Sequence, residues 1–371
     1  MTKKILQINK FYYPHLGGVE TVVKDIAEEL DSDNWLVDVL VCQSKGPRSV
    51  ETIGNNKVYR AASFGKALGM PLSLDFFRLM KQLWKHYDII IIHHPFPLAF
   101  LPLLFLPKKP LVIWYHCDII RQKISKLFFL PFIHYGLKIA NKIVVSTSRL
   151  TAFSPLLKKY KHKCQTIHFG LDLNHYQLTP EVALAAQKIK EHYSSDKKLL
   201  LSVGRLVYYK GYQYLIQAMT SIEAQLLIIG TGPEKEALAS LIQDQHLENK
   251  ITIIDPVDDL RPYYAACDLF ILPSCASSEA FGLVQLEAMA FQKPVINTDL
   301  PTGVPEVSLN EETGLTVPLK DQQSLKQAIQ KILNNEELSK LYGEKAKQRV
   351  SNLFNKENFK TELSQTLDQL E

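Results

Sequence analysis

The sequence lacks closely paired cysteines, low-complexity tracts and any strong excess of one charge. Its five cysteines are scattered with no Cys-x-x-Cys pair, and an odd number of this kind favours reduced thiols in the cytoplasm. The net charge of +5 is too small to indicate a nucleic-acid partner, although it suits anionic ligands or an anionic membrane surface.

A clear membrane-spanning segment is also missing. Residues 89–107 contain no Lys, Arg, Asp or Glu, but four prolines and two histidines interrupt them, which a spanning helix tolerates poorly. We predict a buried strand, a turn and a short apolar helix there. The opening residues, MTKKILQINK, contain only a short apolar run, which predicts a first strand and not a secretion signal.

What the sequence does contain is an alternation of apolar strands and amphipathic helices. At 371 residues it is too long for one ordinary core, so two domains are expected. Continuous apolar strands between helices predict an α/β fold with parallel sheets covered on both faces. The predicted strands are 4–8, 36–42, 88–92, 111–115, 142–146, 199–203, 225–229, 251–254, 268–272 and 294–297. The predicted helices include 19–30, 73–86, 212–219, 234–244 and 282–291.

The alternation is interrupted once, by a polar stretch at 173–197 that follows QTIHFGLD. A fresh strand–turn–helix pattern starts at LLLSVGR, so the domain boundary is predicted near 175–195. After residue 322 the chain is helical and charged to its end.

Two loops are candidates for phosphate binding. Gly17 and Gly18 precede a helix, where glycines let the backbone approach a phosphate and free N–H groups attract anions. An ordinary strand–helix turn would look the same. Arg205 follows a strand and Lys210 precedes a helix, so both cations would face the edge where α/β folds bind ligands. Solvated surface charges are the simpler interpretation of such a pair.

A third loop, GTGP, places Gly230 and Gly232 between a strand and a helix. It lacks the third glycine of the dinucleotide fingerprint, and no acid follows at the position that would bind a ribose. A nicotinamide dinucleotide site is therefore not expected.

The segment SEAFGLVQLEAMAFQKPV carries two acids, Glu279 in a loop and Glu287 in the following helix. Two carboxylates can accept hydrogen bonds from the vicinal hydroxyls of a sugar or ribose. The backbone amides of Phe281, Gly282 and Leu283 would offer donors to an anion. A paired-acid hydrolase also fits, and so do an acid at a helix start and a solvated helix glutamate.

Together these motifs resemble the family-4 retaining glycosyltransferases. The resemblance covers essentially the whole chain and is carried by LGGVE, IHFGLD, VGRL with KG, GTGP, EAFGLVQLE and the run GVPEV to TGLTVP. It implies a GT-B architecture of two Rossmann-like domains facing a central cleft. One departure is Gln292, where family members usually have glycine, which leaves the local turn geometry open.

The resemblance implies three segments. Residues 1–180 would form the acceptor-side domain and residues 195–350 the nucleotide-sugar-binding domain, while the helix at 351–371 would pack back toward the N-terminal domain. No cofactor is implied, and the oligomeric state is not predicted.

Residue by residue, the resemblance implies a site for a nucleotide diphosphate sugar. Gly17 and Gly18 would approach the diphosphate with their backbone. Arg205 and Lys210 would neutralise the leaving nucleotide diphosphate, whose charge grows as the glycosidic bond breaks.

The same resemblance assigns the sugar and ribose contacts. Glu279 would hold hydroxyls of the donor sugar, with backbone help from Phe281, Gly282 and Leu283. Glu287 would bind the ribose.

His116, in LVIWYHCD, matches the family's histidine beside the donor sugar and the acceptor. A satisfied buried histidine is the alternative, and nearby Asp118 is given only a supporting role. Asp31 and Asp33 in DSD mimic a metal-binding motif of another fold, but they follow a helix and predict a turn. We therefore expect no metal.

A membrane-facing surface is predicted at 117–142. Basic Arg121, Lys123 and Lys126 alternate there with apolar side chains, a pattern typical of peripheral membrane contact as well as of a core helix with a basic edge. The apolar set is Leu127, Phe128, Phe129, Leu130 and Phe132.

HCDIIRQK in this region also resembles a subgroup acting on polyprenyl-diphosphate-linked saccharides, often with GDP-mannose. The expected activity is retaining transfer of a hexose to a lipid-linked saccharide in cell-surface polysaccharide synthesis, on the inner face of the plasma membrane. A transferase using a UDP- or dTDP-sugar on another acceptor is the main alternative. A phosphorylase, an epimerase, a paired-acid hydrolase and a non-catalytic sugar-nucleotide binder stay open.

Overall fold

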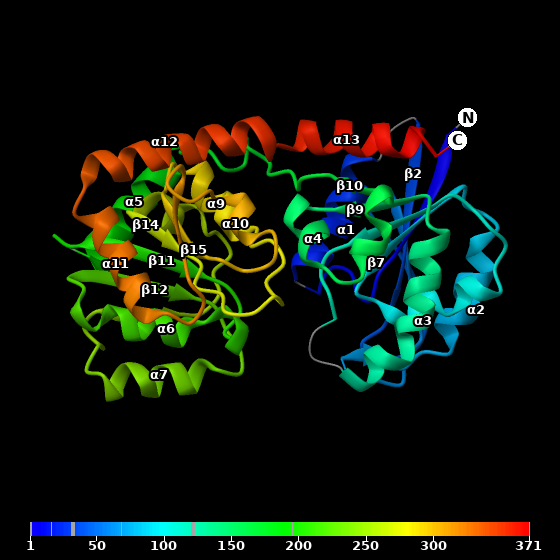
Figure 1. The fold of residues 1–371 in the computed structure, drawn as a ribbon, viewed down its shortest axis with the longest axis horizontal. Coiled ribbons are helices and arrows are strands. Elements are labelled where there is room, and N and C mark those ends of the chain that lie inside the picture. The colour runs from blue at the N-terminus through cyan, green and yellow to red at the C-terminus, as the bar shows by residue number, and fades with distance from the viewer. Residues whose placement is uncertain are drawn as a thin grey trace. The chain divides into compact units, whose positions relative to one another are not determined.

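The computed structural model describes residues 2–15, 17–30, 34–67, 69–119, 123–194 and 196–370, without the side chains of residues 123–126. The chain divides into two compact units (Figure 1). Unit 1 comprises Met1–Phe169 and Glu357–Glu371, and unit 2 comprises Gly170–Lys356. The division thus falls just before the polar stretch at which the sequence predicts a boundary.

A twisted, mostly parallel sheet forms the centre of unit 1. Its strand order is β10-β9-β8-β7-β1-β2-β4-β3, and neighbours from β10 to β4 pair in parallel. The bounds are β1 (Lys3–Ile8), β2 (Trp35–Cys42), β3 (Ser49–Ile53), β4 (Asn56–Ala61), β7 (Ile89–His94), β8 (Leu111–Tyr115), β9 (Lys142–Val145) and β10 (Cys164–Thr166). A separate antiparallel pair is formed by β5 (Lys66–Ala67) and β6 (Met70–Pro71).

The edge strand β3 departs from the all-parallel prediction, because it pairs antiparallel with β4. Gly54 turns the chain between them with φ of 60°, a left-handed conformation that glycine adopts without strain. Since β3 is largely exposed, it has no apolar run, and the sequence pattern did not indicate it.

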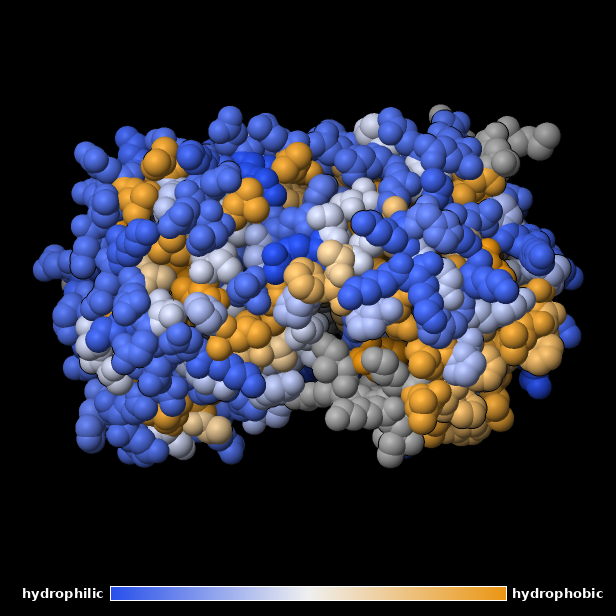
Figure 2. Space-filling view, in the orientation of Figure 1, coloured by the Kyte–Doolittle hydropathy of each residue, from blue (hydrophilic) through white to orange (hydrophobic). Residues whose placement is uncertain are grey.

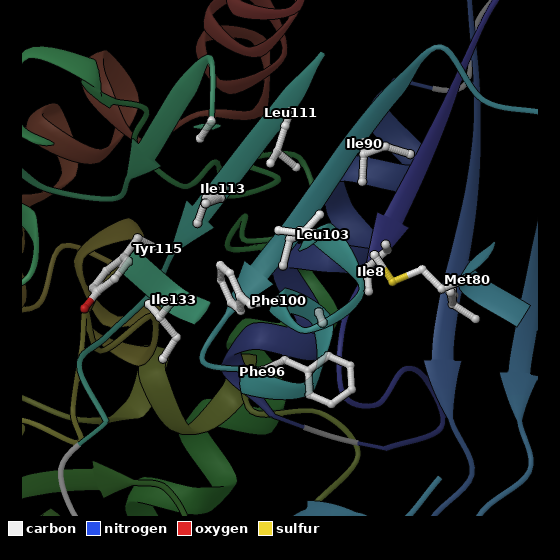
Figure 3. Close-up of a cluster of buried hydrophobic side chains, with 14 of the residues drawn as sticks. Ile8, Met80, Ile90, Phe96, Phe100, Leu103, Leu111, Ile113, Tyr115 and Ile133 are labelled. Atoms are coloured by element: carbon white, nitrogen blue, oxygen red, sulfur yellow. The ribbon is translucent and has the colours of Figure 1, made fainter. Parts of the chain in front are cut away.

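One face of this sheet packs on a large apolar core. Figure 3 shows Ile8, Ile90 and Ile113 pointing toward Phe96, Phe100 and Ile133 from the segments that cover that face. The helical elements of unit 1 are α1 (Gly18–Glu29), α2 (Asp75–Trp84), η1 (Pro97–Phe100), η2 (Pro102–Leu104), α3 (Lys123–Ile139), α4 (Ser148–Phe153), η3 (Leu157–Lys163) and α13 (Lys356–Asp368).

Residues 89–107 form the buried strand β7 followed by the short 3₁₀ helices η1 and η2. Pro97 and Pro102 open these helices, and Pro102 lacks the backbone N–H that one longer α-helix starting at Pro97 would need. Among the described residues, no helix is both long and apolar enough to cross a membrane.

The opposite face of the unit 1 sheet is covered by α1 and by α13 from the far end of the chain. Gln7 of β1 donates a hydrogen bond from Nε2 to the carbonyl oxygen of Val23 in α1, at 3.0 Å. The ring of Phe359 in α13 lies 6.0 Å from that of Trp114, and Leu363 and Leu367 are fully buried. The C-terminal helix is therefore part of the unit 1 core.

Unit 2 is a second parallel sheet with helices on both faces, in the strand order β13-β12-β11-β14-β15-β16 (Figure 1). Its strands are β11 (Lys198–Val203), β12 (Ala224–Ile229), β13 (Ile251–Ile254), β14 (Leu269–Ile271), β15 (Val295–Thr298) and β16 (Gly314–Val317). Its helical elements are α5 (Pro180–Tyr193), η4 (Tyr208–Lys210), α6 (Tyr212–Ala218), η5 (Met219–Ser221), α7 (Lys235–Asp244), α8 (Arg261–Ala266), α9 (Val284–Ala290), α10 (Val304–Val307), α11 (Gln322–Leu333) and α12 (Glu336–Leu353).

The apolar alternation of these strands decides which helix covers which face. Leu226 and Ile228 of β12 join the core beneath α6, α7 and α11. The motif-bearing loops follow the carboxyl ends of β11 and β14, which are neighbours in the sheet. This adjacency brings together loops that are far apart in the sequence.

The backbone at Gln292 explains why family members usually have glycine there. Its φ is 57°, in the left-handed region that favours glycine, and it directly follows Phe291, the residue that caps the end of α9. The chain therefore keeps the left-handed turn that is usual for glycine, although a residue with a side chain is strained in that conformation.

Candidate functional site

An ion pair between Lys210 and Glu279 lies at the centre of the unit 2 site. Lys210 ends the short helix η4 after β11, and Glu279 lies in the loop between β14 and α9. The Lys210 Nζ is 2.6 Å from Glu279 Oε2, and each residue is only 8% exposed. Ser274 donates a hydrogen bond to the same carboxylate oxygen, at 3.0 Å. Two residues that the sequence singled out separately are thus in direct contact.

Lys210 remains a cation in this environment. Burial lowers the pKa of Lys210, but the carboxylate of Glu279, together with Tyr212 and Tyr209, outweighs burial and leaves the pKa above its ordinary value. A buried ammonium held in this way offers a fixed positive charge at low dielectric, where it interacts strongly with an anion.

Gly204 makes room for Lys210. Its φ is 151°, and a Cβ there would lie 3.0 Å from Cε and 3.1 Å from Nζ of Lys210. The next residue, Arg205, has an exposed side chain and makes no ion pair within the described part of the chain. The end of β11 thus supplies one buried cation and one exposed cation.

Glu287 lies on α9, where Tyr264 of α8 donates a hydrogen bond to its Oε2 at 2.6 Å. Tyr264 is fully buried, and Glu287 is half-buried. Burial raises the pKa of Glu287, and hydrogen bonds from the hydroxyls of Tyr264 and Tyr176 partly oppose that rise. The tyrosine therefore fixes one oxygen of the Glu287 carboxylate.

The helix that carries Glu287 begins at Val284 and not near Gly282 as predicted. Gly282 has φ of 75°, and a Cβ there would lie 2.5 Å from Leu272 Cδ2, so the position requires glycine and cannot be helical. Phe281 is buried with its ring 6.0 Å from that of Phe354, which leaves its backbone as the group to offer a ligand. The amides of Gly282 and Leu283 donate no hydrogen bond to the described residues.

In unit 1, Gly17 and Gly18 lie exposed at the start of α1. The helix begins at Gly18, one residue before the predicted start, and Thr21 donates its backbone N–H to the Gly17 carbonyl at 2.9 Å. A Cβ on Gly17 would lie 2.4 Å from Glu20 Oε2, so any side chain would displace that carboxylate.

His116 follows β8 and is 4% exposed. Its Nε2 lies 3.0 Å from Nδ1 of His93, and Nε2 of His93 lies 2.9 Å from Oε1 of Gln7. Burial lowers the pKa of His116 to about 3, so the ring is neutral at physiological pH. The sequence motifs did not indicate Gln7 or His93, although each is a polar residue inside an apolar strand, which is a visible signal.

Asp118 has structural partners in the loop after β8. It accepts hydrogen bonds from Tyr115 and, at 2.9 Å, from Oγ of Ser154. These contacts tie that loop to the segment after α4.

The predicted membrane surface is described only in part. Arg121 and the side chains of Lys123 and Lys126 lie outside the described residues, as do Asp31 and Asp33 of the DSD motif. Leu127 and Phe128 are 73% and 64% exposed, Leu130 and Phe132 are half-buried, and Phe129 is buried in the core. Figure 2 shows apolar side chains gathered on the lower part of unit 1, near α3.

The chain matches two family models. One, described as "Glycosyl transferases group 1", covers residues 185–349, and the other, "Glycosyltransferase Family 4", covers residues 16–175. Together they span most of both units.

Curated relatives match along nearly the full length. O-antigen chain mannosyltransferase C of Escherichia coli is 30% identical over 364 residues, covering 95% of this chain and 94% of the relative. D-rhamnosyltransferase WbpZ of Pseudomonas aeruginosa is 29% identical over 364 residues, covering 95% and 92%.

Among solved structures, sucrose-phosphate synthase from Thermosynechococcus elongatus aligns over 99% of both chains with a TM-score of 0.83. The sequence identity is 23%, so this similarity shows the fold, a GT-B arrangement of two Rossmann-like domains.

Proposed function

Because this chain belongs to the group 1 glycosyltransferases and is therefore a sugar-transferring enzyme, we propose that it moves a hexose from a nucleotide diphosphate sugar to a polyprenyl-diphosphate-linked saccharide. GDP-mannose is the favoured donor, and cell-surface polysaccharide synthesis is the process. The names of a mannosyltransferase and a rhamnosyltransferase of similar length support the choice of sugar. The buried Lys210–Glu279 ion pair is the observation that carries the proposal.

The two cations at the end of β11 bind the donor diphosphate. Arg205 is exposed and can form two hydrogen bonds to phosphate oxygens, while Lys210 supplies a buried point charge. Gly17 and Gly18 add backbone contacts to the same group. When the bond from the anomeric carbon to the phosphate oxygen breaks, the leaving diphosphate gains charge that these cations stabilise.

The two glutamates divide the rest of the donor between them. Glu279 accepts hydrogen bonds from sugar hydroxyls, and the backbone of Phe281, Gly282 and Leu283 contributes donors beside it. Glu287, fixed by Tyr264, binds the ribose hydroxyls. His116 lies beside the sugar. The acceptor hydroxyl oxygen bonds to the anomeric carbon on the face that the diphosphate leaves, and its proton passes to the departing diphosphate, so the anomeric configuration is retained. The protein cations provide the charge compensation without a metal ion.

A peripheral position on the inner face of the plasma membrane brings the enzyme to an acceptor whose lipid tail stays in the bilayer. Leu127 and Phe128 on α3 and Phe105 after η2 are exposed apolar side chains of unit 1. Apolar groups of this kind add to the attraction between basic residues and anionic lipid.

The decisive experiment is a transfer assay with a donor panel. GDP-mannose, a UDP-hexose and a dTDP-hexose are each offered with a polyprenyl-diphosphate-linked saccharide, and thermal shifts with GDP, UDP and dTDP run in parallel. We expect a product extended by one hexose in the α-configuration and the largest thermal shift with GDP.

Other outcomes would replace the proposal. Transfer only from a UDP- or dTDP-sugar would change the donor, and an inverted product would reject retention. Epimerised donor would indicate an epimerase. Hydrolysis without acceptor would indicate a hydrolase, and binding without turnover a sugar-nucleotide binder. A pyridoxal-phosphate absorbance band would indicate a phosphorylase.

A further inference from the structure

A line of buried polar side chains crosses three neighbouring strands of unit 1. β1, β7 and β8 are adjacent in the sheet, with Gln7 opposite Ile91 and His93 opposite Trp114. Since side chains two residues apart share a face, Gln7, His93 and His116 all point to the face that α1 covers. Gln7 and His93 are fully buried and His116 is 4% exposed, so their hydrogen bonds do not compete with water.

The orientation of the Gln7 amide is fixed by α1. Its Nε2 lies 3.0 Å from the carbonyl oxygen of Val23, which can only accept a hydrogen bond. The opposite amide orientation would place two oxygens against each other at that distance. The Gln7 Oε1 therefore faces His93, as the hydrogen-bond network requires.

This orientation determines the tautomer of His93. The Gln7 Oε1 only accepts, so His93 Nε2, at 2.9 Å, must carry a proton and donate it. Complete burial keeps the pKa of His93 far below its ordinary value, so the ring is neutral and has one proton. His93 Nδ1 is therefore a lone-pair acceptor.

The tautomer of His93 determines in turn the tautomer of His116. His93 Nδ1 can only accept, so His116 Nε2, at 3.0 Å, must be the donor. A neutral His116 then has no proton on Nδ1, and that atom makes no hydrogen bond to the described residues. We propose that Gln7 and His93 are positioning residues that hold His116 in its Nε2–H tautomer and so make Nδ1 an acceptor for a substrate hydroxyl. The involvement of substrate rests on the proposed function, whereas the tautomer does not.

This assignment has a consequence for specificity. A hydroxyl can donate to Nδ1, but a fluorine or a carbonyl oxygen at the same position cannot. One net hydrogen bond corresponds to a rate or affinity effect of about 3- to 10-fold. A donor in which the hydroxyl that contacts His116 Nδ1 is replaced by fluorine should react, or bind, about 3- to 10-fold more weakly with the wild-type enzyme.

The tautomer can be measured directly with the full-length protein labelled with ¹⁵N-histidine. A long-range ¹⁵N–¹H correlation spectrum distinguishes protonated from unprotonated ring nitrogens, and His116→Gln identifies the signals of His116. We expect a protonated Nε2 and an unprotonated Nδ1 in wild type. Gln7→Met removes the acceptor for His93, and we expect the single tautomer of His116 to be lost. Gln165→Met, which removes a glutamine of unit 1 bonded instead to Thr366, is the control.

A kinetic cycle then separates positioning from a structural role. Gln7→Met should lower kcat/KM by about 3- to 10-fold, while in the His116→Gln background it should have no further effect. Equal losses in both backgrounds would show that Gln7 acts through the fold and not through His116. A protonated Nδ1 on His116 in the wild-type protein would overturn the proposed tautomer but would leave the proposed transferase activity unaffected. The predicted tautomer without any sugar transfer would reject the proposed function alone.

Discussion

At the scale of single residues, the buried ammonium of Lys210 is central to the proposed donor site. It pairs with Glu279, and both groups are shielded from water. A diphosphate that approaches Lys210 adds a second anion to a site that already holds one. We propose that Glu279 then turns its oxygens to sugar hydroxyls, which would couple phosphate and sugar recognition through one ion pair.

The cations are tested by removing each one. Lys210→Ala and Arg205→Ala should each lower turnover by about 100-fold or more, because each removes charge stabilisation from the leaving group. Both should also weaken binding of the free nucleoside diphosphate in calorimetry. Lys235→Ala is a matched control, because Lys235 forms an exposed ion pair with Asp255 in the same unit and should matter little. Wild-type turnover in Arg205→Ala and Lys210→Ala would reject these roles.

The two glutamates should separate in a binding experiment. Glu279→Ala should impair sugar transfer without weakening the binding of bare GDP, because it removes a sugar contact and also the carboxylate that pairs with Lys210 and would compete with the diphosphate. Glu287→Ala should weaken GDP itself, because Tyr264 holds this carboxylate for the ribose. Isothermal calorimetry with GDP decides, and equal losses in the two variants would mean that the roles are misassigned.

Sequence motifs identified the charged residues of unit 2 but not how they pair. The apolar runs of the sequence indicate where the strands end. The charged residues that follow those ends are Arg205, Lys210, Glu279 and Glu287. The contact between Lys210 and Glu279 depends on β11 and β14 being neighbours, and strand order is a long-range property that local patterns do not contain. Gln7 and His93 were not predicted as site residues, because the apolar pattern that identifies a strand gives no information about a single polar residue within it.

At the scale of elements, the buried histidines at the ends of β7 and β8 make unit 1 sensitive to acid. The folded pKa of His116 is about 3 and that of His93 is also lowered, while an unfolded histidine titrates near 6.5. Below pH 6.5 the unfolded chain therefore binds protons that the folded chain does not. Stability is full above pH 6.5 and falls as the pH drops, by about 1.4 kcal/mol per pH unit for each such histidine.

Tryptophan fluorescence can follow this effect, because Trp35, Trp84 and Trp114 all lie in unit 1. The urea midpoint should fall between pH 7 and pH 5, and it should fall less steeply in His116→Gln. His192→Gln, which removes an exposed histidine, should keep the wild-type slope. An identical slope in wild type and His116→Gln would contradict the low folded pKa.

The elements themselves were largely predictable where they are buried. The apolar runs indicated β1, β2, β7 and β8 to within a few residues, because burial on both faces leaves an unbroken signal. The exposed hairpin strand β3 carries no such signal. The start of α9 was placed too early because the sequence displays neither the left-handed φ of Gly282 nor the position of Leu272, which leaves no room there for a Cβ.

At the scale of the whole molecule, net charge and exposed apolar groups predict reversible membrane attachment. Basic residues contribute about 1 kcal/mol each near an anionic leaflet, so Arg121, Lys123 and Lys126 would give a few kcal/mol. Liposome co-sedimentation should rise with anionic lipid and fall with salt. Reversing these three charges should abolish it without affecting nucleotide binding.

The apolar contribution has its own matched pair of variants. Leu127→Ser with Phe128→Ser should weaken sedimentation several-fold, because both side chains are exposed on α3. Leu184→Ser changes an exposed leucine on α5 of unit 2 and should leave sedimentation unchanged. Failure of the wild-type protein to bind anionic liposomes at low salt would end the membrane proposal.

The composition of unit 1 from two distant segments has a consequence for biosynthesis. Residues 357–371 follow all of unit 2 along the chain, yet Phe359, Leu363 and Leu367 are buried in unit 1. On the ribosome, where domains fold as they emerge, unit 2 is complete before unit 1 receives this helix. Trp114 and its neighbours stay uncovered during that interval, so a premature stop near residue 356 would spare unit 2 and leave an aggregation-prone surface on unit 1.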